Sequence, residues 1–69
     1  MLYQDLADRL QGLIKTQVYP IGSALPGVRR LSEQHGVSVS TAVNACQELE
    51  RRGLLEAKPR SGFFVLQPP

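Results

Sequence analysis

The sequence predicts a mainly α-helical domain of three helices with a small β-hairpin at its C-terminal end. Apolar residues recur at helical spacing in three segments between residues 2 and 52. At residues 55–58 they alternate with polar residues, as in a β-strand, and residues 63–66 are a run of strand-prone apolar residues. Glycine and proline separate the segments. With 69 residues, the chain forms one small domain with a thin core.

The first predicted helix covers about residues 2 to 16. Its apolar stripe runs from Leu2 to Ile14 with spacings of four, four, three and one residues. This spacing places the apolar side chains on one face of a helix. Pro20 and Gly22 follow and are expected to break the chain.

The second and third helices are predicted to be joined by a turn of about three residues. The second is short and starts after Leu25-Pro26-Gly27. Gly36 is expected to end it, because glycine tolerates the left-handed conformation that follows many helices. Ser38 is then expected to cap the third helix, which covers about residues 39 to 52 and ends at Gly53.

The last segment is predicted to form the β-hairpin. Strand-prone residues flank Pro-Arg-Ser-Gly at residues 59–62, which are typical of a turn. Gln67-Pro68-Pro69 cannot continue a strand, so we expect a domain over residues 1–66 and the start of a linker at 67–69. Helix, short helix, tight turn, helix and hairpin is the order of elements in a winged helix-turn-helix.

Composition argues against several functional classes. The single cysteine, Cys46, allows no intrachain disulfide and suits a reducing cytoplasm, and no zinc-site spacing is present. No apolar run approaches the ~18 residues of a membrane span. The sequence contains no phosphate loop and no carboxylate cluster, and Lys15 and Lys58 are expected to be exposed. We therefore expect a cytoplasmic protein that is not an enzyme and binds neither metal nor membrane.

The net charge of +2 is unevenly placed. Residues 1–24 are neutral in sum, so residues 25–69 hold the whole positive excess. An excess this small is weak evidence for a nucleic-acid partner, because most charges on a small domain are simply solvated. The functional prediction therefore depends on the motif.

The third helix offers a face that could read DNA, because a helix held by a short turn can enter the major groove. At 100° per residue, its buried direction is set by Ala42, Ala45, Cys46 and Leu49, and the opposite direction by Ser40, Asn44, Gln47 and Arg51. Asn44 could pair with adenine and Val43 could contact a thymine methyl group. The same face could equally be ordinary solvated surface. Arg51 and Arg52, at the far end, are expected to be solvated and to complement the helix dipole.

Three segments of the sequence resemble the GntR family of bacterial transcription regulators. They are the leading Leu2–Ala7, the segment Leu25–Thr41 and the segment Leu49–Val65, in order and with the family's gaps. The Pro-Arg-Ser-Gly-Phe-Phe-Val stretch is most similar to the MocR subgroup. In that subgroup a linker joins this domain to a large domain that resembles a fold-type I aminotransferase and binds pyridoxal phosphate.

The resemblance implies roles for individual residues. Arg29 matches the family's phosphate-contacting arginine, and the residues that open the third helix match its DNA-contacting positions. Arginine is common in the family where this chain has Val39 and Val43. Together with the residues expected on the helix and the wing, the predicted DNA-binding set is Arg29, Ser38, Val39, Ser40, Thr41, Val43, Asn44, Lys58, Arg60, Ser61 and Gly62.

The predicted function is sequence-specific binding of double-stranded DNA. The helix at about 39–52 is expected in the major groove and the wing at about 58–63 at the backbone or minor groove. By its resemblance, the parent protein would be a homodimer, whereas the isolated domain would be a monomer or weak dimer without a cofactor. Pyridoxal phosphate would bind a C-terminal domain outside this chain. The alternative is a winged-helix module that binds a protein instead of DNA.

Overall fold

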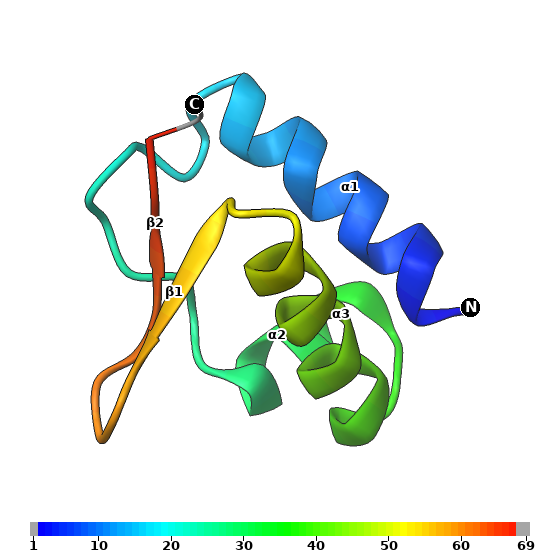
Figure 1. Cartoon of the computed structure of the whole chain (residues 1–69). Coiled ribbons are helices and arrows are strands. Elements are labelled where there is room, and N and C mark those ends of the chain that lie inside the picture. The colour runs from blue at the N-terminus through cyan, green and yellow to red at the C-terminus, as the bar shows by residue number, and fades with distance from the viewer. Residues whose placement is uncertain (1, 68–69) are drawn as a thin grey trace.

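The computed structural model describes residues 2–67 and contains the predicted elements in the predicted order. Three helices pack around a common core, and a two-stranded hairpin extends from one side (Figure 1). The elements are α1 (Tyr3–Lys15), α2 (Val28–His35), α3 (Val39–Arg51), β1 (Leu55–Lys58) and β2 (Gly62–Val65). The winged helix-turn-helix fold class is therefore confirmed. Of the predicted linker at 67–69, only Gln67 lies within the described residues.

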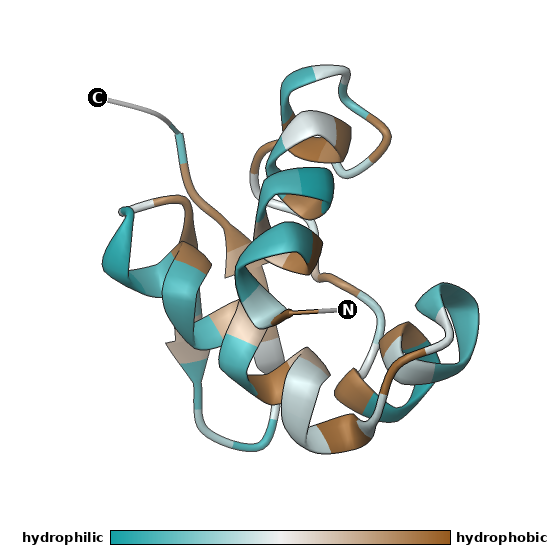
Figure 2. Ribbon diagram, turned by 90° about the vertical axis from the view of Figure 1, so that its right-hand side faces the viewer, coloured by the Kyte–Doolittle hydropathy of each residue, from teal (hydrophilic) through white to brown (hydrophobic). Residues whose placement is uncertain are grey.

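The core is formed mainly by α1 and α3. Leu6 and Leu10 of α1, Leu31 of α2 and Leu49 of α3 are fully buried, and Leu55 of β1 is almost fully buried. Each helix has a hydrophilic and a hydrophobic side, which Figure 2 shows as teal and brown. This arrangement follows from the helical spacing of the apolar residues.

The apolar stripe of α1 starts later than predicted. Leu2 was expected to belong to the stripe, but it lies before the first helical residue and is 67% exposed. The buried side chains of this helix are Leu6, Ala7, Leu10 and Ile14. Leu2 therefore contributes its backbone carbonyl, which accepts from the amides of Asp5 and Leu6, rather than its side chain.

A third extended segment pairs with the hairpin, and the sequence did not predict it. The amide of Leu25 donates to the carbonyl of Phe63 (2.9 Å), and the amide of Val65 donates to the carbonyl of Ser23 (2.9 Å). Ala24 and Phe64 form an antiparallel bridge. The loop between α1 and α2 thereby anchors the base of the hairpin to the helical core.

Candidate nucleic-acid interface

The turn between α2 and α3 is built around Gly36 and Ser38. Gly36 has φ 67°, a left-handed conformation that glycine adopts without steric cost. Its amide and that of Val37 both donate to the carbonyl of Ser32, which closes the C-terminal end of α2. Only three residues, Gly36 to Ser38, therefore separate α2 from α3.

Ser38 caps α3 as predicted. Its hydroxyl accepts from the amide of Thr41 at 3.2 Å, and its carbonyl accepts from the amide of Ala42 at 3.1 Å. The Ser38 hydroxyl also lies 2.9 Å from the Thr41 hydroxyl and 3.2 Å from the Ser40 hydroxyl. The start of α3 is thus an ordered group of three hydroxyls beside backbone amides that precede the first helical hydrogen bond, which is a favourable environment for an anion.

The two faces of α3 lie where the periodicity predicted them. Its inner face is fully buried and consists of Ala42, Ala45, Cys46 and Leu49. On the outer face Ser40, Asn44, Gln47 and Arg51 are exposed, with Thr41 and Val43 half-buried on the flanks. Val39, the first residue of the helix, is 44% exposed. The outer face is consequently polar and uncharged over its first two turns.

The other predicted site residues lie at the start of α2 and at the wing tip. Arg29 is exposed in the first turn of α2, and Arg60, Ser61 and Gly62 are exposed at the tip. The start of α2, the start of α3 and the wing tip lie at the same end of the molecule, the lower end in Figure 1. The fold thus brings three segments that are distant in sequence to one surface.

Lys58 is more constrained than its neighbours at the wing tip. Its ammonium group lies 4.6 Å from the centre of the Phe64 ring and 3.8 Å from a carboxylate oxygen of Glu56. The register pairs Glu56 with Phe64 across the hairpin, so both partners lie two residue pairs behind the Lys58–Gly62 pair at the tip. Lys58 is half exposed, so its ammonium group stays open to solvent while it contacts these partners.

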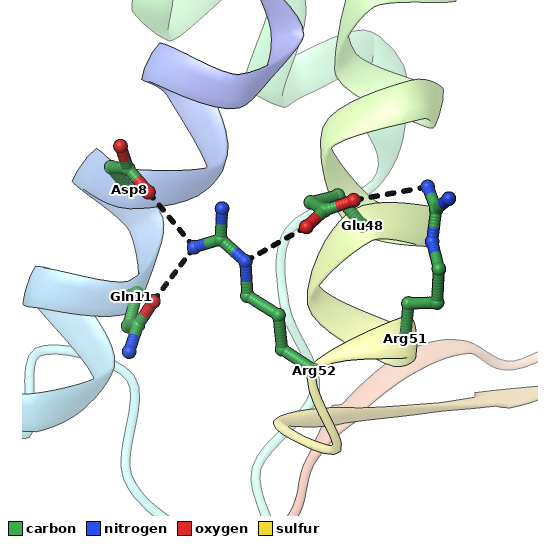
Figure 3. Close-up of polar contacts among 5 residues, drawn as sticks. All are labelled: Asp8, Gln11, Glu48, Arg51 and Arg52. Carbon is green, nitrogen blue, oxygen red and sulfur yellow. Dashed lines mark hydrogen bonds and ion pairs between the residues drawn. The ribbon is translucent and has the colours of Figure 1, made fainter.

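Arg52 lies at the C-terminal end of α3 as expected, but it makes contacts that the sequence did not predict. Its Nη1 donates to Asp8 Oδ1 and Gln11 Oε1 of α1, both at 2.8 Å, and its Nε donates to Glu48 Oε2 at 2.9 Å (Figure 3). The side chain is only 28% exposed. Hydrogen bonds to Asp8 and then to Glu48 raise the pKa of the guanidinium group. Arg52 therefore connects the end of α3 to α1 and is not simply a solvated charge; Arg51 pairs with Glu48 at 3.0 Å and is solvent-exposed as expected.

Two further features concern the whole described part of the chain. Among residues 2–67, no group of three or more histidine, cysteine, aspartate or glutamate side chains is placed to hold a metal ion. Within the same residues, no helix has the length and apolar character needed to cross a membrane.

Residues 2–65 match the family described as "Bacterial regulatory proteins, gntR family". The chain belongs to the GntR family. Its membership makes this domain the DNA-binding domain of a GntR-type transcriptional regulator and not an enzyme. Winged-helix GntR domains bind double-stranded DNA, and the comparisons give no support to a protein-docking module.

Relatives of the GntR family resemble the chain in sequence and in structure. It is 49% identical to the HTH-type transcriptional regulator YjiR of Escherichia coli over 65 residues. The aligned segment covers 94% of this chain and 14% of that protein. It is 37% identical to the regulator YcxD of Bacillus subtilis, over 94% of this chain and 15% of that protein. Thus the chain spans about a seventh of the length of these relatives.

Among solved structures, the GntR protein of Streptococcus agalactiae matches 96% of this chain and 32% of its own, with a TM-score of 0.85 and 36% identity. A transcriptional regulator from Oenococcus oeni matches 93% of this chain and 53% of its own, with a TM-score of 0.83 and 30% identity. The GntR winged-helix fold is therefore shared over nearly the whole chain.

Proposed function

We propose that the first two turns of α3 lie in the major groove of DNA, with the start of α2 and the wing tip on the flanking backbone and minor groove. The observation that carries this proposal is the convergence of these three exposed segments at one end of the molecule (Figure 1). In this arrangement α3 would present Ser38, Val39, Ser40, Thr41, Val43 and Asn44, α2 would present Arg29, and the wing Lys58, Arg60, Ser61 and Gly62.

The ion pairs of the domain support a phosphate-binding role for two arginines. Within residues 2–67 the four ion pairs use Arg51, Arg52 and Lys58, and none uses Arg29 or Arg60. Arg9 and Arg30 are also outside these ion pairs, but Arg29 and Arg60 are the two that lie at the start of α2 and at the wing tip, where the proposed surface needs phosphate contacts. Each would release one condensed counterion on contact with a phosphate.

Binding to DNA as a function of salt concentration tests this assignment. Arg29→Ala and Arg60→Ala should each weaken binding to all sequences and reduce the salt slope by about one unit. Arg9→Ala removes the same charge from the exposed surface of α1 and should leave the slope nearly unchanged. A change of base preference with an intact slope would assign Arg29 or Arg60 to base contact instead.

Selection of binding sites from random DNA tests the position of α3. Asn44 is exposed and points away from the core, so Asn44→Ala should cost little stability. It should relax the preference at one base position by ~1–3 kcal/mol, as expected for a bidentate amide–adenine pair. Gln4→Ala, an exposed truncation on α1, is the control. Identical sites and affinities for wild type and Asn44→Ala would show that Asn44 does not face the groove.

For the whole protein, we propose a homodimeric regulator of the MocR subgroup that acts in the bacterial cytoplasm. Two observations support the assignment to the MocR subgroup: the Pro-Arg-Ser-Gly-Phe-Phe-Val wing and the length of the relatives. The chain covers 14%, 15% and 14% of three similar regulators, which leaves room for a large additional domain. That domain would bind pyridoxal phosphate, which supplies electrophilic carbonyl chemistry to an enzyme-like pocket.

The isolated domain should not itself hold pyridoxal phosphate. Its two lysines, Lys15 and Lys58, are exposed, and neither is desolvated as a Schiff-base lysine would be. Treatment of this domain with pyridoxal phosphate and borohydride should therefore label neither lysine stoichiometrically. Stoichiometric labelling of one lysine would contradict the placement of the cofactor in another domain.

A further inference from the structure

We propose that Val39 and Val43 read the C5-methyl groups of pyrimidines, in thymine or 5-methylcytosine, on the floor of the major groove. The inference rests on the proposed position of α3 in that groove. It adds the class of base feature that the helix recognises, and it assigns that recognition to two apolar side chains and not to a charged one.

The first observation is the exposure of Val39. The large apolar side chains exposed within the described residues are Leu2, Val18, Ile21 and Val39. Leu2 precedes α1, and Val18 and Ile21 lie in the loop after it, whereas Val39 is the first residue of α3. An exposed valine at a helix start does not belong to the core. Its apolar side chain can therefore pack against a partner that covers this face.

The second observation is the position of Val43. It lies four residues after Val39, so the two side chains are neighbours on one flank of α3. The other flank carries Glu48, which connects through Arg52 to α1. The valine pair therefore faces away from α1. Valine is rigid about χ1, so the pair forms a fixed apolar step beside the exposed Asn44.

The third observation is the absence of charge from this part of α3. From Val39 to Gln47 the helix contains no charged residue. Guanine is most often read by a bidentate arginine or lysine, which this surface does not offer. The thymine methyl is the apolar feature of the major-groove edges. An apolar valine step beside an amide fits sites in which adenine–thymine pairs predominate.

The experiment uses the DNA site selected by the wild-type chain, with each thymine replaced in turn by deoxyuridine. This change removes the methyl group and leaves every hydrogen-bonding group of the base in place. One or two replacements should weaken wild-type binding by about fourfold each, which corresponds to roughly 0.8 kcal/mol per buried carbon group. At the same positions, 5-methylcytosine should bind more tightly than cytosine when each is paired with guanine.

The variants assign the effect to the protein side. Val39→Ser and Val43→Ser should each lose the sensitivity to the thymine methyl group at one base position. Val18→Ser, the same change at an exposed loop residue, should keep that sensitivity at every position. Because Val39 is exposed, Val39→Ser should melt like the wild type, so its result does not depend on folding.

Equal binding of thymine and deoxyuridine sites by the wild type, or full sensitivity in both helix variants, would overturn the inference. If the wild type instead does not distinguish the selected site from random DNA, the proposed function fails and the inference fails with it.

Discussion

Arg60 adopts a backbone conformation that its side chain disfavours. The turn has Pro59 at its second position and Arg60, with φ 67°, at its third, and it closes with a hydrogen bond from the Ser61 amide to the Lys58 carbonyl (3.1 Å). A type II turn has this pattern, and glycine is the usual residue where φ is positive. Strain of this kind is found often at functional sites. The conformation is thus consistent with a DNA contact by the guanidinium group.

Arg60→Gly should therefore separate stability from binding. Glycine removes the strain of the left-handed conformation but gains entropy in the unfolded chain, so we expect an increase of up to about 1 kcal/mol in the free energy of unfolding. DNA affinity should fall as much as in Arg60→Ala, which loses the same charge but keeps the strain. Thermal melts and binding assays of both variants measure the difference. A lower melting temperature for Arg60→Gly than for Arg60→Ala would contradict the strain argument.

Cys46 illustrates how the core controls the chemistry of a side chain. It is fully buried, and burial raises the pKa of its thiol from 9.0 to about 11. Because the folded pKa lies above the unfolded one, the thiol does not lower the free energy of unfolding below pH 9. Between about pH 9 and 11 the unfolded thiol ionises first, so the free energy of unfolding falls. A thiol reagent at pH 8 should label Cys46 only when the domain unfolds. Rapid labelling under native conditions, at a rate independent of stability, would show that the thiol is accessible.

At the scale of the element, Ser38 has a capping function and a proposed position near DNA, and the two can be tested separately. As the cap of α3 it accepts from the Thr41 amide, so Ser38→Ala should lower the free energy of unfolding by about 1 kcal/mol. Ser38→Asp keeps the cap and should keep the stability. The added carboxylate should nevertheless repel the DNA phosphates and weaken binding. If Ser38→Asp binds DNA as tightly as the wild type, the start of α3 does not approach a phosphate.

The contact between α1 and α3 provides a second prediction for an element. Arg52 joins Asp8, Gln11 and Glu48 at the surface of the helix pair. Because the site is partly exposed, a double-mutant cycle of Arg52→Ala and Asp8→Ala should give a coupling energy of at most about 1 kcal/mol, which falls as salt is added. Gln4→Ala in place of Asp8→Ala is the uncoupled control. A coupling energy of zero at low salt would mean that the bridge does not hold the two helices.

Local patterns in the sequence predicted the elements better than the contacts between them. Helical periodicity placed the buried and exposed faces of α3 correctly, and the Ser38 cap is a local signal. The bridge made by Arg52 was missed because one of its partners, Asp8, lies 44 residues away in the sequence. The spacing of Glu48 and Arg52 at i and i+4 was the only local sign. The site assignments remain predictions, because DNA contacts depend on a partner outside the chain.

At the scale of the whole molecule, the segment around Ala24 is a second case in which local sequence patterns did not predict a contact between distant segments. It was predicted to be a break because proline and glycine surround it, yet it pairs with β2. Its extended shape is imposed by the hairpin, whose edge offers hydrogen bonds, and not by alternating residues of its own. The three segments that form the proposed DNA surface are likewise brought together by the common core. Loss of the core should therefore abolish binding without any change to the contacting residues.

Leu49→Ala tests this dependence on the core. Leu49 is fully buried in α3, so the truncation should lower the free energy of unfolding by ~2–5 kcal/mol. A domain of this size has ~3–10 kcal/mol in total, so a large fraction of the variant should be unfolded at 37 °C. Leu2→Ala, the same change at an exposed leucine, should stay within about 0.5 kcal/mol of the wild type.

The apparent DNA affinity of Leu49→Ala should be lower than that of the wild type only because part of the variant is unfolded. Excess DNA binds the folded state and should restore the fold, so the melting temperature should rise with DNA concentration as it does for the wild type. The salt slope should stay at the wild-type value, because no phosphate contact has been removed. Circular dichroism melts with and without DNA, combined with a salt titration at low temperature, measure both quantities. A reduced salt slope in the folded variant would show that Leu49 also shapes the DNA-binding surface and does more than stabilise the core.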